Sequence, residues 1–531
     1  RSREQAKVAE QRLAQNSKLS SIEEKLNNGE ELSRKDLRRM MREYEKEEQA
    51  ETEEPEVVSN VTFEVDSLAT KRDSTYWSVV RPVPLTPAEV RGYFVEDSLS
   101  VVAEQEAEDE ANGIKKSNNS NGNAGKLLNI FTGTQLKLGE DRYLHYDGLH
   151  NGGFNPVEGY WLASRIRYTQ KSDKDRFRIL LTPRYGFSWD RLVWRADADY
   201  GFGPSHSYNT LMLSSGRYVS QFNEPRPVSE LFNTVYALLV ERNFVRIYEK
   251  EFLGLNWEKK WRSTASLKSR LEWAHRRNYG NTTSQTWFNR DDRIYPSNSP
   301  ASAIIENIFI TPDREKAATL DIAFMVAPWQ KYSVRNGNRS PIEESSPQFT
   351  LNYRAGLPDI GESVTDYQRL GLTYRHTIRP GVRGKIDLKV DMGLFLSDSY
   401  VGLADYRHFD GNQMIFTSAD PVGSFRLLPY YSFSTRDRWL ATSVHYQFRK
   451  FLLTQIWEVQ MTGAKENVFV NYLNTPTSEH YTEVGYGIDN IFRFFRLEGI
   501  AAFRDGEYFD WGIRIGIASN LLGGFGSVDT E

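Results

Sequence analysis

The sequence predicts an all-β transmembrane antiparallel β-barrel of about 16 strands, preceded by an N-terminal helical segment. Three observations predict this fold. From about residue 154 onward, apolar and polar residues alternate with a period of two, which is typical of strands with one apolar face. Many of these runs have ~10–13 residues, which suits the ~9–11 residues of a bilayer-spanning strand better than the ~5–6 of soluble sheets. No apolar run reaches the ~18 residues of a membrane helix.

The last of these runs, YFDWGIRIGI, illustrates the alternation. One face is apolar and consists of Phe509, Trp511, Ile513, Ile515 and Ile517. The other face consists of Tyr508, Asp510, Gly512, Arg514 and Gly516. The apolar face meets either a protein core or lipid, and the strand lengths favour lipid. The 13% aromatic content fits the aromatic girdles of a barrel, although a β-sandwich array with aromatic cores would share it.

The polar faces of the predicted strands carry arginine together with acidic residues on neighbouring strands. Bulk water would accept any soluble side chain there, whereas a barrel lumen favours mutually paired charges. We therefore expect a lumen charge network of Arg165, Arg167, Arg176, Arg178, Arg195, Asp197, Asp199, Lys385, Asp387, Asp391, Asp510 and Arg514. Closure into a barrel would also remove the exposed edges that such long strands otherwise present.

Composition divides the chain into three regions. Residues 1–102 are charged and contain helix-capping patterns, so they predict a helical periplasmic segment that contacts envelope protein partners. One of its predicted helices has a narrow apolar stripe of Leu37, Met40, Met41 and Tyr44. Residues 103–125 are acidic and then rich in Asn and Gly, which predicts a disordered linker. Residues 126–531 are the predicted barrel domain.

Two segments interrupt the strand pattern. Residues 225–243 predict an amphipathic helix that either caps the barrel or lies at the membrane surface. Its apolar face would consist of Leu231, Val235, Leu238 and Leu239. Residues 281–315 predict a long loop, and the long loops of bacterial barrels are extracellular.

Composition also excludes several classes of function. The chain has no cysteine, so disulfides, thiolate metal sites and cysteine nucleophiles are excluded. Its formal net charge of -4 argues against nucleic-acid binding. The histidines lack a His-x-x-x-His spacing, and the adjacent Asp291 and Asp292 are flanked by arginine, which argues against a calcium loop. We expect no catalytic residue, no cofactor and no metal.

Two short patterns are candidates for chemistry. Ser443 and His445 share the polar face of one predicted strand, a spacing that resembles barrel phospholipases with the order of the two residues reversed. Without an oriented third group, we interpret them as ordinary lumen residues. The Asp-Ser-Leu sequences around Ser67 and Ser98 resemble bacterial O-glycosylation sites, so these two serines are possible modification sites.

Three stretches resemble a known family: RDSTYWSVVRPVPLTPAEVRGYFVEDSL (72–99), GLHNGGFNPVEGYWLASRIRY (148–168) and HYTEVGYGIDNIFRFFRLEGIAAFRDGEYFDWGIRIGI (480–517). They are similar to the Gram-negative outer-membrane carboxypeptidase-regulatory-like domain proteins that have a C-terminal domain of unknown function. The resemblance covers most of the chain from about residue 70. It implies a location in the cell outer membrane, a longer full-length protein with an immunoglobulin-like domain, and no peptidase activity.

The last hairpin also resembles the end of BamA/TamA-type barrels, which insert or export other proteins. A Gly-rich strand, a turn, an Arg-led strand and a final aromatic strand carry this likeness. The Val-Arg-Gly-Tyr/Phe loop motif of those barrels has no counterpart inside the predicted barrel. EVRGYF (89–94) lies in a predicted capped helix, and VRGK (382–385) lies in a predicted hairpin turn.

We therefore expect an outer-membrane β-barrel that acts as a scaffold or subunit of an envelope protein assembly, in contact with outer-membrane lipid. The alternatives are a transport pore and a protein-export or insertion barrel of the BamA/TamA type. A barrel hydrolase ranks below both.

Overall fold

The computed structural model describes residues 60–61, 76 and 133–517, the last range without 140, 150, 173–174, 205–206, 225–226, 262–263, 289–292, 307–311, 336–337, 343–345, 382–383, 418–421 and 493–494. The predicted helical segment 1–102 and linker 103–125 therefore lie outside the described residues, apart from Asn60, Val61 and Tyr76. Ser67 and Ser98 also lie outside them. None of the described helices is long and apolar enough to cross a membrane.

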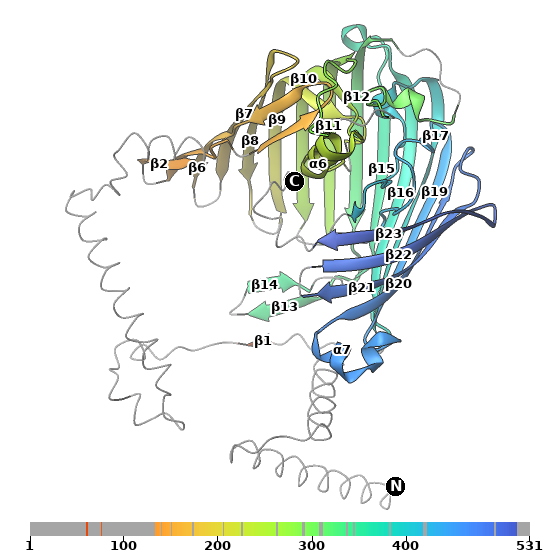
Figure 1. The fold of residues 1–531 in the computed structure, drawn as a ribbon. Helices are drawn as coiled ribbons and strands as arrows, with labels where there is room; N and C mark the ends of the chain where they lie inside the picture. The colour runs from red at the N-terminus through yellow and green to blue at the C-terminus, as the bar shows by residue number, and fades with distance from the viewer. Residues whose placement is uncertain are drawn as a thin grey trace, which may run out of the picture.

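One large sheet dominates the described chain (Figure 1). Its strands are β2 (Thr134–Gly139), β3 (Arg142–Tyr146), β4 (Asn151–Asn155), β5 (Gly159–Ala163), β6 (Ile166–Lys171), β7 (Arg176–Gly186), β8 (Arg191–Phe202), β9 (Ser207–Gln221), β10 (Ile247–Trp261), β11 (Ala265–Asn278), β12 (Arg314–Val326), β15 (Gln348–Gly356), β16 (Asp366–Ile378), β17 (Gly384–Tyr400), β18 (Phe416–Thr417), β19 (Arg438–Phe448), β20 (Lys465–Asn474), β21 (Tyr481–Ile491), β22 (Phe495–Arg504) and β23 (Glu507–Ile517). A small sheet contains β1 (Asn60–Val61), β13 (Tyr332–Arg335) and β14 (Asn338–Pro341). The helical elements are α6 (Glu230–Val240), α7 (Trp457–Met461), η2 (Pro300–Ser302), η3 (Ile360–Glu362), η5 (Leu403–Asp405) and η6 (Leu453–Gln455).

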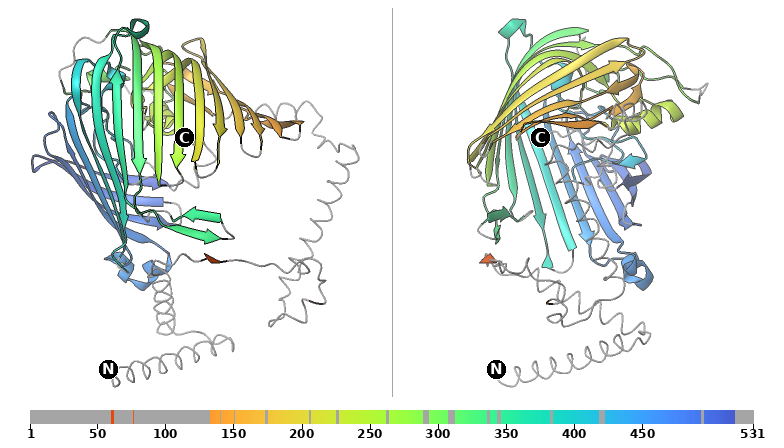
Figure 2. Two further views of the ribbon diagram at one scale, coloured as in Figure 1. Left: turned by 180° about the vertical axis from the view of Figure 1, so that it is seen from behind. Right: turned by 90° about the vertical axis from the view of Figure 1, so that its left-hand side faces the viewer.

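The large sheet is an antiparallel meander. From β6 to β12, each strand pairs with the next one along the chain, and the ladder then continues through β15, β16, β17, β19 and on to β23. The strands from β9 to β19 form a long wall, and both ends of the sheet curve round toward the same side (Figures 1 and 2). The predicted antiparallel topology is therefore confirmed.

Within the described residues the sheet has 20 strands, against about 16 predicted. Part of this difference in strand number arises because two of the strands are interrupted. β5 and β6 both pair with β7, so β5 and β6 together form one interrupted strand. On the other side, β4 pairs with β5 and β3 pairs with β6, so β3 and β4 form a second interrupted strand. The alternation pattern does not register such a break, because the side chains keep the same face on either side of it.

The predicted closure of the barrel is not found as a ladder between the first and last strands. In the described part of the chain, β2 pairs with β3 alone, while β23 pairs with β22 and, in parallel, with the two-residue β18. Phe416 and Thr417 of β18 lie opposite Ile515 and Gly516 of β23. The edge that would meet β2 is thus partly occupied by a loop strand, and the sheet is curved but not closed edge to edge.

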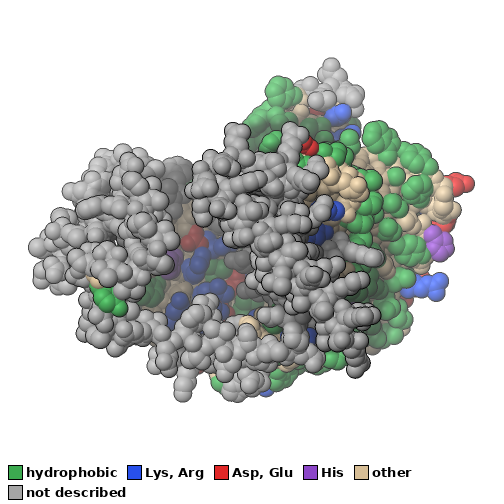
Figure 3. Space-filling model, turned by 90° about the horizontal axis from the view of Figure 1, so that it is seen from below, with side chains coloured by type: hydrophobic (Ala, Val, Ile, Leu, Met, Phe, Trp, Pro, Cys, Tyr) green, Lys and Arg blue, Asp and Glu red, His purple; other side chains and the backbone are tan. Residues whose placement is uncertain are grey.

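The two faces of the sheet differ in polarity. Large apolar side chains are exposed on the outer face, among them Ile179, Leu192, Leu213, Leu253, Leu351, Leu396, Val484 and Trp511. Seen from below, basic and acidic side chains are visible in the hollow of the sheet, and hydrophobic side chains cover much of the outer surface on the right of the view (Figure 3). This separation agrees with the period-two pattern.

One predicted strand departs from its expected register. A β-bulge separates Ala502 from Phe503 in the β22–β23 ladder, and Phe509 on β23 has no partner there. The ring of Phe509 packs edge-on against Tyr481, whose side chain is fully buried on the inner side. The assignment of Phe509 to the outer face was therefore wrong, because the bulge adds one residue to the alternation. Tyr508 is displaced in the same way and is exposed.

The connections at the two ends of the sheet differ in length. The loop end carries the connections 187–190, 222–246, 279–313, 357–365 and 401–437. The turn end carries the connections 203–206, 262–264, 327–347, 379–383, 449–464 and 492–494. The predicted long loop 281–315 thus lies at the loop end, although its last residues, 314 and 315, already belong to β12.

The helix predicted over 225–243 is confirmed as α6. Ser229 begins it, and its hydroxyl accepts a hydrogen bond from the Phe232 N–H at 3.5 Å. On the predicted apolar face, Leu238 is buried whereas Leu231 and Val235 are exposed. The helix also turns Asn233 inward, where its amide accepts from two backbone N–H groups and donates to Asn243.

Candidate functional site: the in-folded loop and the polar interior

Residues 401–437, which join β17 to β19, fold into the concave side of the sheet. We call this segment the in-folded loop. Five of its residues, Phe409, Phe425, Leu427, Leu428 and Phe433, form one buried cluster with side chains of β19 to β22. The wall residues of that cluster are Trp439, Phe469, Leu473, Tyr481, Ile500 and Ala502. Because these aromatic and leucine side chains are removed from water, the segment packs as core rather than as a solvated loop.

The same loop also packs against other parts of the sheet. Val401, Leu403, Tyr406 and Tyr431 are buried in a cluster that includes Tyr367 of β16 and Phe222. Met414 is buried in a further cluster that contains Val193 of β8 and Val245. The in-folded loop therefore spans the concavity from the β19–β22 wall to the strands near the start of the sheet.

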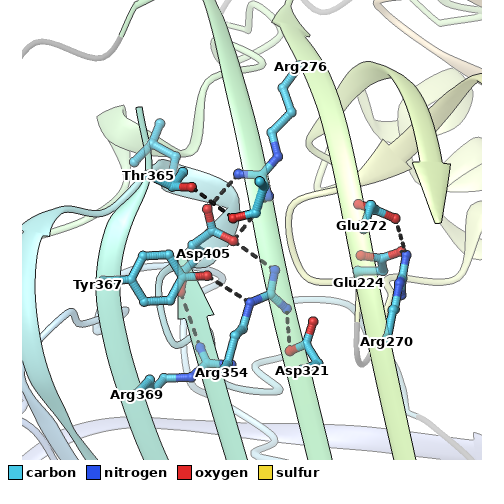
Figure 4. A network of polar contacts seen from close by, with 12 residues as sticks. Glu224, Arg270, Glu272, Arg276, Asp321, Arg354, Thr365, Tyr367, Arg369 and Asp405 are labelled. Atoms are coloured by element: carbon cyan, nitrogen blue, oxygen red, sulfur yellow. Dashed lines mark hydrogen bonds and ion pairs between the residues drawn. The ribbon is translucent and has the colours of Figure 1, made fainter. Parts of the chain in front are cut away.

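A buried carboxylate attaches the loop to the long wall (Figure 4). Asp405 is 1% exposed, and its two oxygens lie 2.5 and 3.1 Å from the guanidinium nitrogens of Arg276 on β11. Arg354 on β15 lies 2.7 Å from the same carboxylate, and Arg369 on β16 donates to the Asp405 carbonyl at 3.2 Å. Burial alone would raise the pKa of Asp405, but the positive charges of Arg276 and Arg354 outweigh it and hold that pKa well below its usual range.

A second buried cluster attaches the loop to the opposite wall. Arg426 Nε and Nη2 donate to the Glu498 carboxylate of β22 at 3.1 and 3.2 Å. The backbone N–H groups of Arg426, Leu427 and Leu428 all donate to the Glu483 carboxylate of β21, at 2.7, 2.7 and 3.0 Å. Both carboxylates are fully buried. Such a cluster specifies one loop conformation, since any displacement leaves charges and N–H groups unpaired.

A third ion cluster ties α6 to the sheet. Arg184 of β7 donates to the buried Glu158 carboxylate from Nε at 2.8 Å, and its Nη1 lies 3.1 Å from Glu230 in α6. Its guanidinium also stacks 3.6 Å from the centre of the Trp161 ring. Burial raises the pKa of Glu230, and the Arg184 charge opposes that rise.

A small polar cavity of about 130 Å³ remains between the in-folded loop and the wall of β17, β19 and β20. Lys389, Asp391, Arg407, His408, Ser443 and Asn471 are among its lining residues. Among the described residues, no three His, Asp or Glu side chains are grouped so that they could hold a metal ion.

His408 of the in-folded loop predicts a pH dependence of stability. Its Nε2 donates to the Leu403 carbonyl at 2.9 Å, so its Nδ1 accepts from the Ser434 hydroxyl at 2.8 Å. Burial lowers the pKa of His408 to about 4, and the Arg407 charge acts in the same direction.

Between pH ~6.5 and ~4 the unfolded chain binds a proton at His408 that the folded chain does not bind, so stability falls as pH is lowered through this window. Below it both states are protonated and the loss is complete. We expect the unfolding free energy of wild type, relative to a His408→Gln variant, to fall by up to about 1.4 kcal/mol per pH unit. Urea titrations in detergent at several pH values measure this difference, and parallel curves for the two proteins would refute it.

Ser443 and His445 do not form a hydrogen-bonded pair. The Ser443 hydroxyl donates to Asn471 Oδ1 at 2.7 Å. His445 is buried, and neither of its ring nitrogens has a hydrogen-bond partner in the described structure. Its ring stacks on Phe469, with centroids 6.3 Å apart. Both residues are on the inner side of β19, and their geometry does not assemble a serine nucleophile with a base.

Nine of the twelve residues of the predicted lumen network lie in separate local ion pairs. Arg178 and Arg176 lie 2.6 and 3.7 Å from Asp199, and Arg195 lies 2.8 Å from Asp197.

The other pairs are formed as follows. Arg167 lies 2.8 Å from Asp147, and Lys385 lies 3.3 Å from Asp387. Asp391 pairs with Arg407 of the in-folded loop.

The remaining three residues behave differently. Arg165 lies at the break between β5 and β6, where its carbonyl accepts from the Asp147 N–H. Asp510 is exposed and accepts from the N–H of its neighbour Trp511. Arg514 donates from Nε to the Arg426 carbonyl at 2.7 Å. Asp510 and Arg514 therefore do not pair, and Arg514 contacts the in-folded loop instead.

Sequence reasoning missed the residues that bind the in-folded loop, namely Arg276, Arg354, Asp405, Arg426, Glu483 and Glu498. One signal was available. The sequence SFRLLPYYSF (424–433) has the composition of a buried core, although it lies outside the alternating strands.

Comparisons with known proteins give one family and several distant structures. No curated protein matches the sequence. Similar solved structures include CdiB from Acinetobacter baumannii, with 10% identity over 71% of this chain and a TM-score of 0.33. A Rhodopseudomonas blastica porin triple mutant has 9% identity over 67% of this chain and 89% of its own, with a TM-score of 0.28. The chain spans 59% of the length of CdiB. Likenesses of this size carry no argument about the present chain.

The family model described as "Family of unknown function (DUF5686) C-terminal domain" matches residues 128–488. The match concerns the C-terminal domain and does not test the carboxypeptidase-regulatory-like resemblance. Since it covers more than half of the sequence, the chain belongs to the DUF5686 family of unknown function through its C-terminal domain.

Proposed function

We propose that the chain is a Gram-negative outer-membrane β-barrel protein that acts as a scaffold or subunit of an envelope protein assembly. The observation that carries the membrane location is the apolar outer face of the sheet. Leu192, Leu253 and Trp511 are 65%, 54% and 66% exposed, on strands from both ends and the middle of the sheet. An apolar surface that extends over so many strands would aggregate in water, whereas lipid would cover it.

The strand lengths support the same proposal. β10 and β9 have 15 residues each, and β17 has 17. A tilted strand needs about 9–11 residues to cross the hydrocarbon region, so these strands are long enough to cross and to project beyond it. The three longest connections at the two ends of the sheet, 222–246, 279–313 and 401–437, lie at the loop end, and in bacterial barrels the longer loops are on the extracellular side. The turn end would then face the periplasm.

The in-folded loop favours a scaffold over an open pore. It crosses the concavity and is attached to opposite walls through Asp405 and Arg426, both of them buried. An open porin lumen is lined by solvated polar groups, whereas this interior contains packed aromatic clusters. A barrel that is filled in this way is better suited to hold partners than to conduct solutes.

The scaffold proposal predicts specific co-purification. The protein, extracted from membranes of its host in mild detergent, should retain envelope protein partners in fixed ratio. Glutamate at Leu37 and Met41, in the predicted apolar stripe of the N-terminal segment, should release them, while Arg39→Glu on the opposite face should not. Purification as a monomer without partners, or equal retention by all three proteins, would refute the proposal.

A second candidate function is protein insertion or export. The observation that favours it is the edge of β23, where only Ile515 and Gly516 have a strand partner on the side away from β22 in the described structure. Such an edge can pair with an incoming strand. Cysteines at Thr417 and Gly516, which are register partners, would link β18 to β23 when oxidised. Loss of substrate insertion on oxidation, restored by a reductant, would support this candidate. Full activity of the linked protein would exclude a role for this edge.

A further inference from the structure

The connection between β19 and β20 at the turn end contains a short helical insert, which we define as residues 451–461. It contains η6 and α7, and two basic residues, Arg449 and Lys450, precede it. The insert packs over a charged residue of β20, and the position of that residue places the insert on the outer side of the sheet.

Glu466, the second residue of β20, belongs to the outer face by alternation. Asn467 and Asn471 are buried on the inner side, whereas Val470 is 38% exposed on the outer side with Glu466. The register partners of Glu466 on the two neighbouring strands are Phe448 of β19 and Ile488 of β21. A bare carboxylate in this position would meet lipid, which is strongly unfavourable.

The insert removes that problem by covering Glu466 completely. The carboxylate is 0% exposed and accepts from the backbone N–H groups of Leu452, Leu453 and Thr454 at 3.1, 2.9 and 2.8 Å. The Thr454 hydroxyl and the Tyr486 phenol also donate to it. These bonds fix the insert against the outer face, where the membrane would be.

Aromatic rings continue from the sheet into the insert. The ring of Phe448 of β19 stacks on that of Phe451 with centroids 4.1 Å apart, and the ring centroids of Tyr446 and Phe448 are 4.2 Å apart. Outward-facing aromatic residues gather at the boundary between lipid and water in barrels. The insert therefore begins at the level at which the hydrocarbon region would end.

The insert exposes apolar side chains on its free side. Leu452, Ile456 and Met461 are 62%, 50% and 55% exposed, and Leu453 is also exposed. This surface is continuous with the apolar outer face through Phe451 and Phe448. The neighbouring Arg449 and Lys450 supply positive charge that suits phospholipid phosphates.

We propose that residues 451–461 form an interfacial anchor that embeds Leu452, Ile456 and Met461 in the phospholipid leaflet at the turn end of the sheet. Glu466 positions the anchor by accepting its backbone N–H groups, so a carboxylate on the lipid-facing side serves to hold an amphipathic insert. The proposal rests on the outer-membrane location proposed above. A protein partner on the same surface is the alternative that the following experiment separates.

The absence of cysteine allows a direct test, since single-cysteine variants can be labelled with an environment-sensitive fluorophore at one site. Three full-length variants are reconstituted in phosphatidylethanolamine and phosphatidylglycerol vesicles with and without brominated lipid: Ile456→Cys, Leu394→Cys and Ile294→Cys. Leu394 is an outward residue of β17, and Ile294, 86% exposed, lies in a connection at the loop end. Brominated lipid should roughly halve the fluorescence at Ile456, since an interfacial insert lies about 5–10 Å into the headgroup and acyl boundary.

The control positions separate the possible failures. Quenching at Leu394 but not at Ile294 shows that the sheet is folded and spans the bilayer. If Leu394 is quenched and Ile456 is not, the anchor is refuted while the membrane location stands. If Leu394 is not quenched, the proposed function fails, and the anchor fails with it. Quenching of Ile456 by aqueous iodide at the rate found for Ile294 would also overturn the anchor.

Discussion

Replacement of Asp405 by alanine is expected to destabilise the protein by about 3 kcal/mol, because it removes the buried carboxylate that Arg276 and Arg354 share. Each arginine keeps one further carboxylate, Glu315 at 3.1 Å and Asp321 at 3.3 Å, which places the loss at the lower end for a buried ion pair. Arg276 and Arg354 both contact this carboxylate, and the side chain of Arg276 is buried while that of Arg354 is partly buried. Equilibrium unfolding by urea in detergent measures the loss. Limited proteolysis should show cleavage within residues 401–437 in the variant under conditions where the wild type is resistant.

A matched control is available on β17, the strand that precedes the in-folded loop. Asp398 of β17 is 56% exposed in its side chain and lies 4.0 Å from Arg436, so its replacement by alanine should cost under about 1 kcal/mol. Equal destabilisation by the two substitutions would contradict the role of Asp405 as the attachment of the in-folded loop to the long wall. So would an Asp405→Ala protein that keeps wild-type protease resistance.

The second large effect is expected at Arg426. Methionine at this position removes the partner of Glu498 and leaves a fully buried carboxylate, which should also cost about 3–5 kcal/mol. The double variant Arg426→Met with Glu498→Met removes both charges. It should be more stable than the Arg426→Met single variant, since the buried Glu498 carboxylate is removed together with its partner.

The double-variant comparison distinguishes charge from packing. The guanidinium of Arg426 also lies 4.5 Å from the centre of the Phe469 ring, so part of any loss reflects that contact. If the second substitution restores no stability, the destabilisation of the single variant comes from packing and not from the buried ion pair. Urea unfolding of the wild type, the two single variants and the double variant measures this directly.

The parts of the fold that the sequence predicts are those with local patterns. The strands of β7, β8, β17 and β23 follow from period-two alternation, and α6 follows from its helical spacing. The errors arise where a long-range contact decides the structure. The bulge at Phe509 changes the face of two side chains, and nothing in the local pattern marks it.

The interior of the sheet was harder to predict for the same reason. The spacing of Arg178 and Asp199 on adjacent strands allowed their pairing to be anticipated, since neighbouring strands are sequential. Asp405 and Arg276 are separated by 129 residues, and only the completed sheet brings them together. Glu466 presents the opposite case: alternation assigns it to the outer face correctly, but the insert that covers it cannot be inferred from alternation.

Ion conductance measures whether the in-folded loop obstructs the interior of the proposed membrane-spanning sheet. Arg407 and Thr435 form a β-bridge, so a short Gly linker can join them and remove residues 408–434 while Asp405 stays in place. In planar bilayers the wild type should be silent, and the shortened protein should show stable open channels. A wild type that conducts as well as the shortened protein would show that the loop does not obstruct the interior.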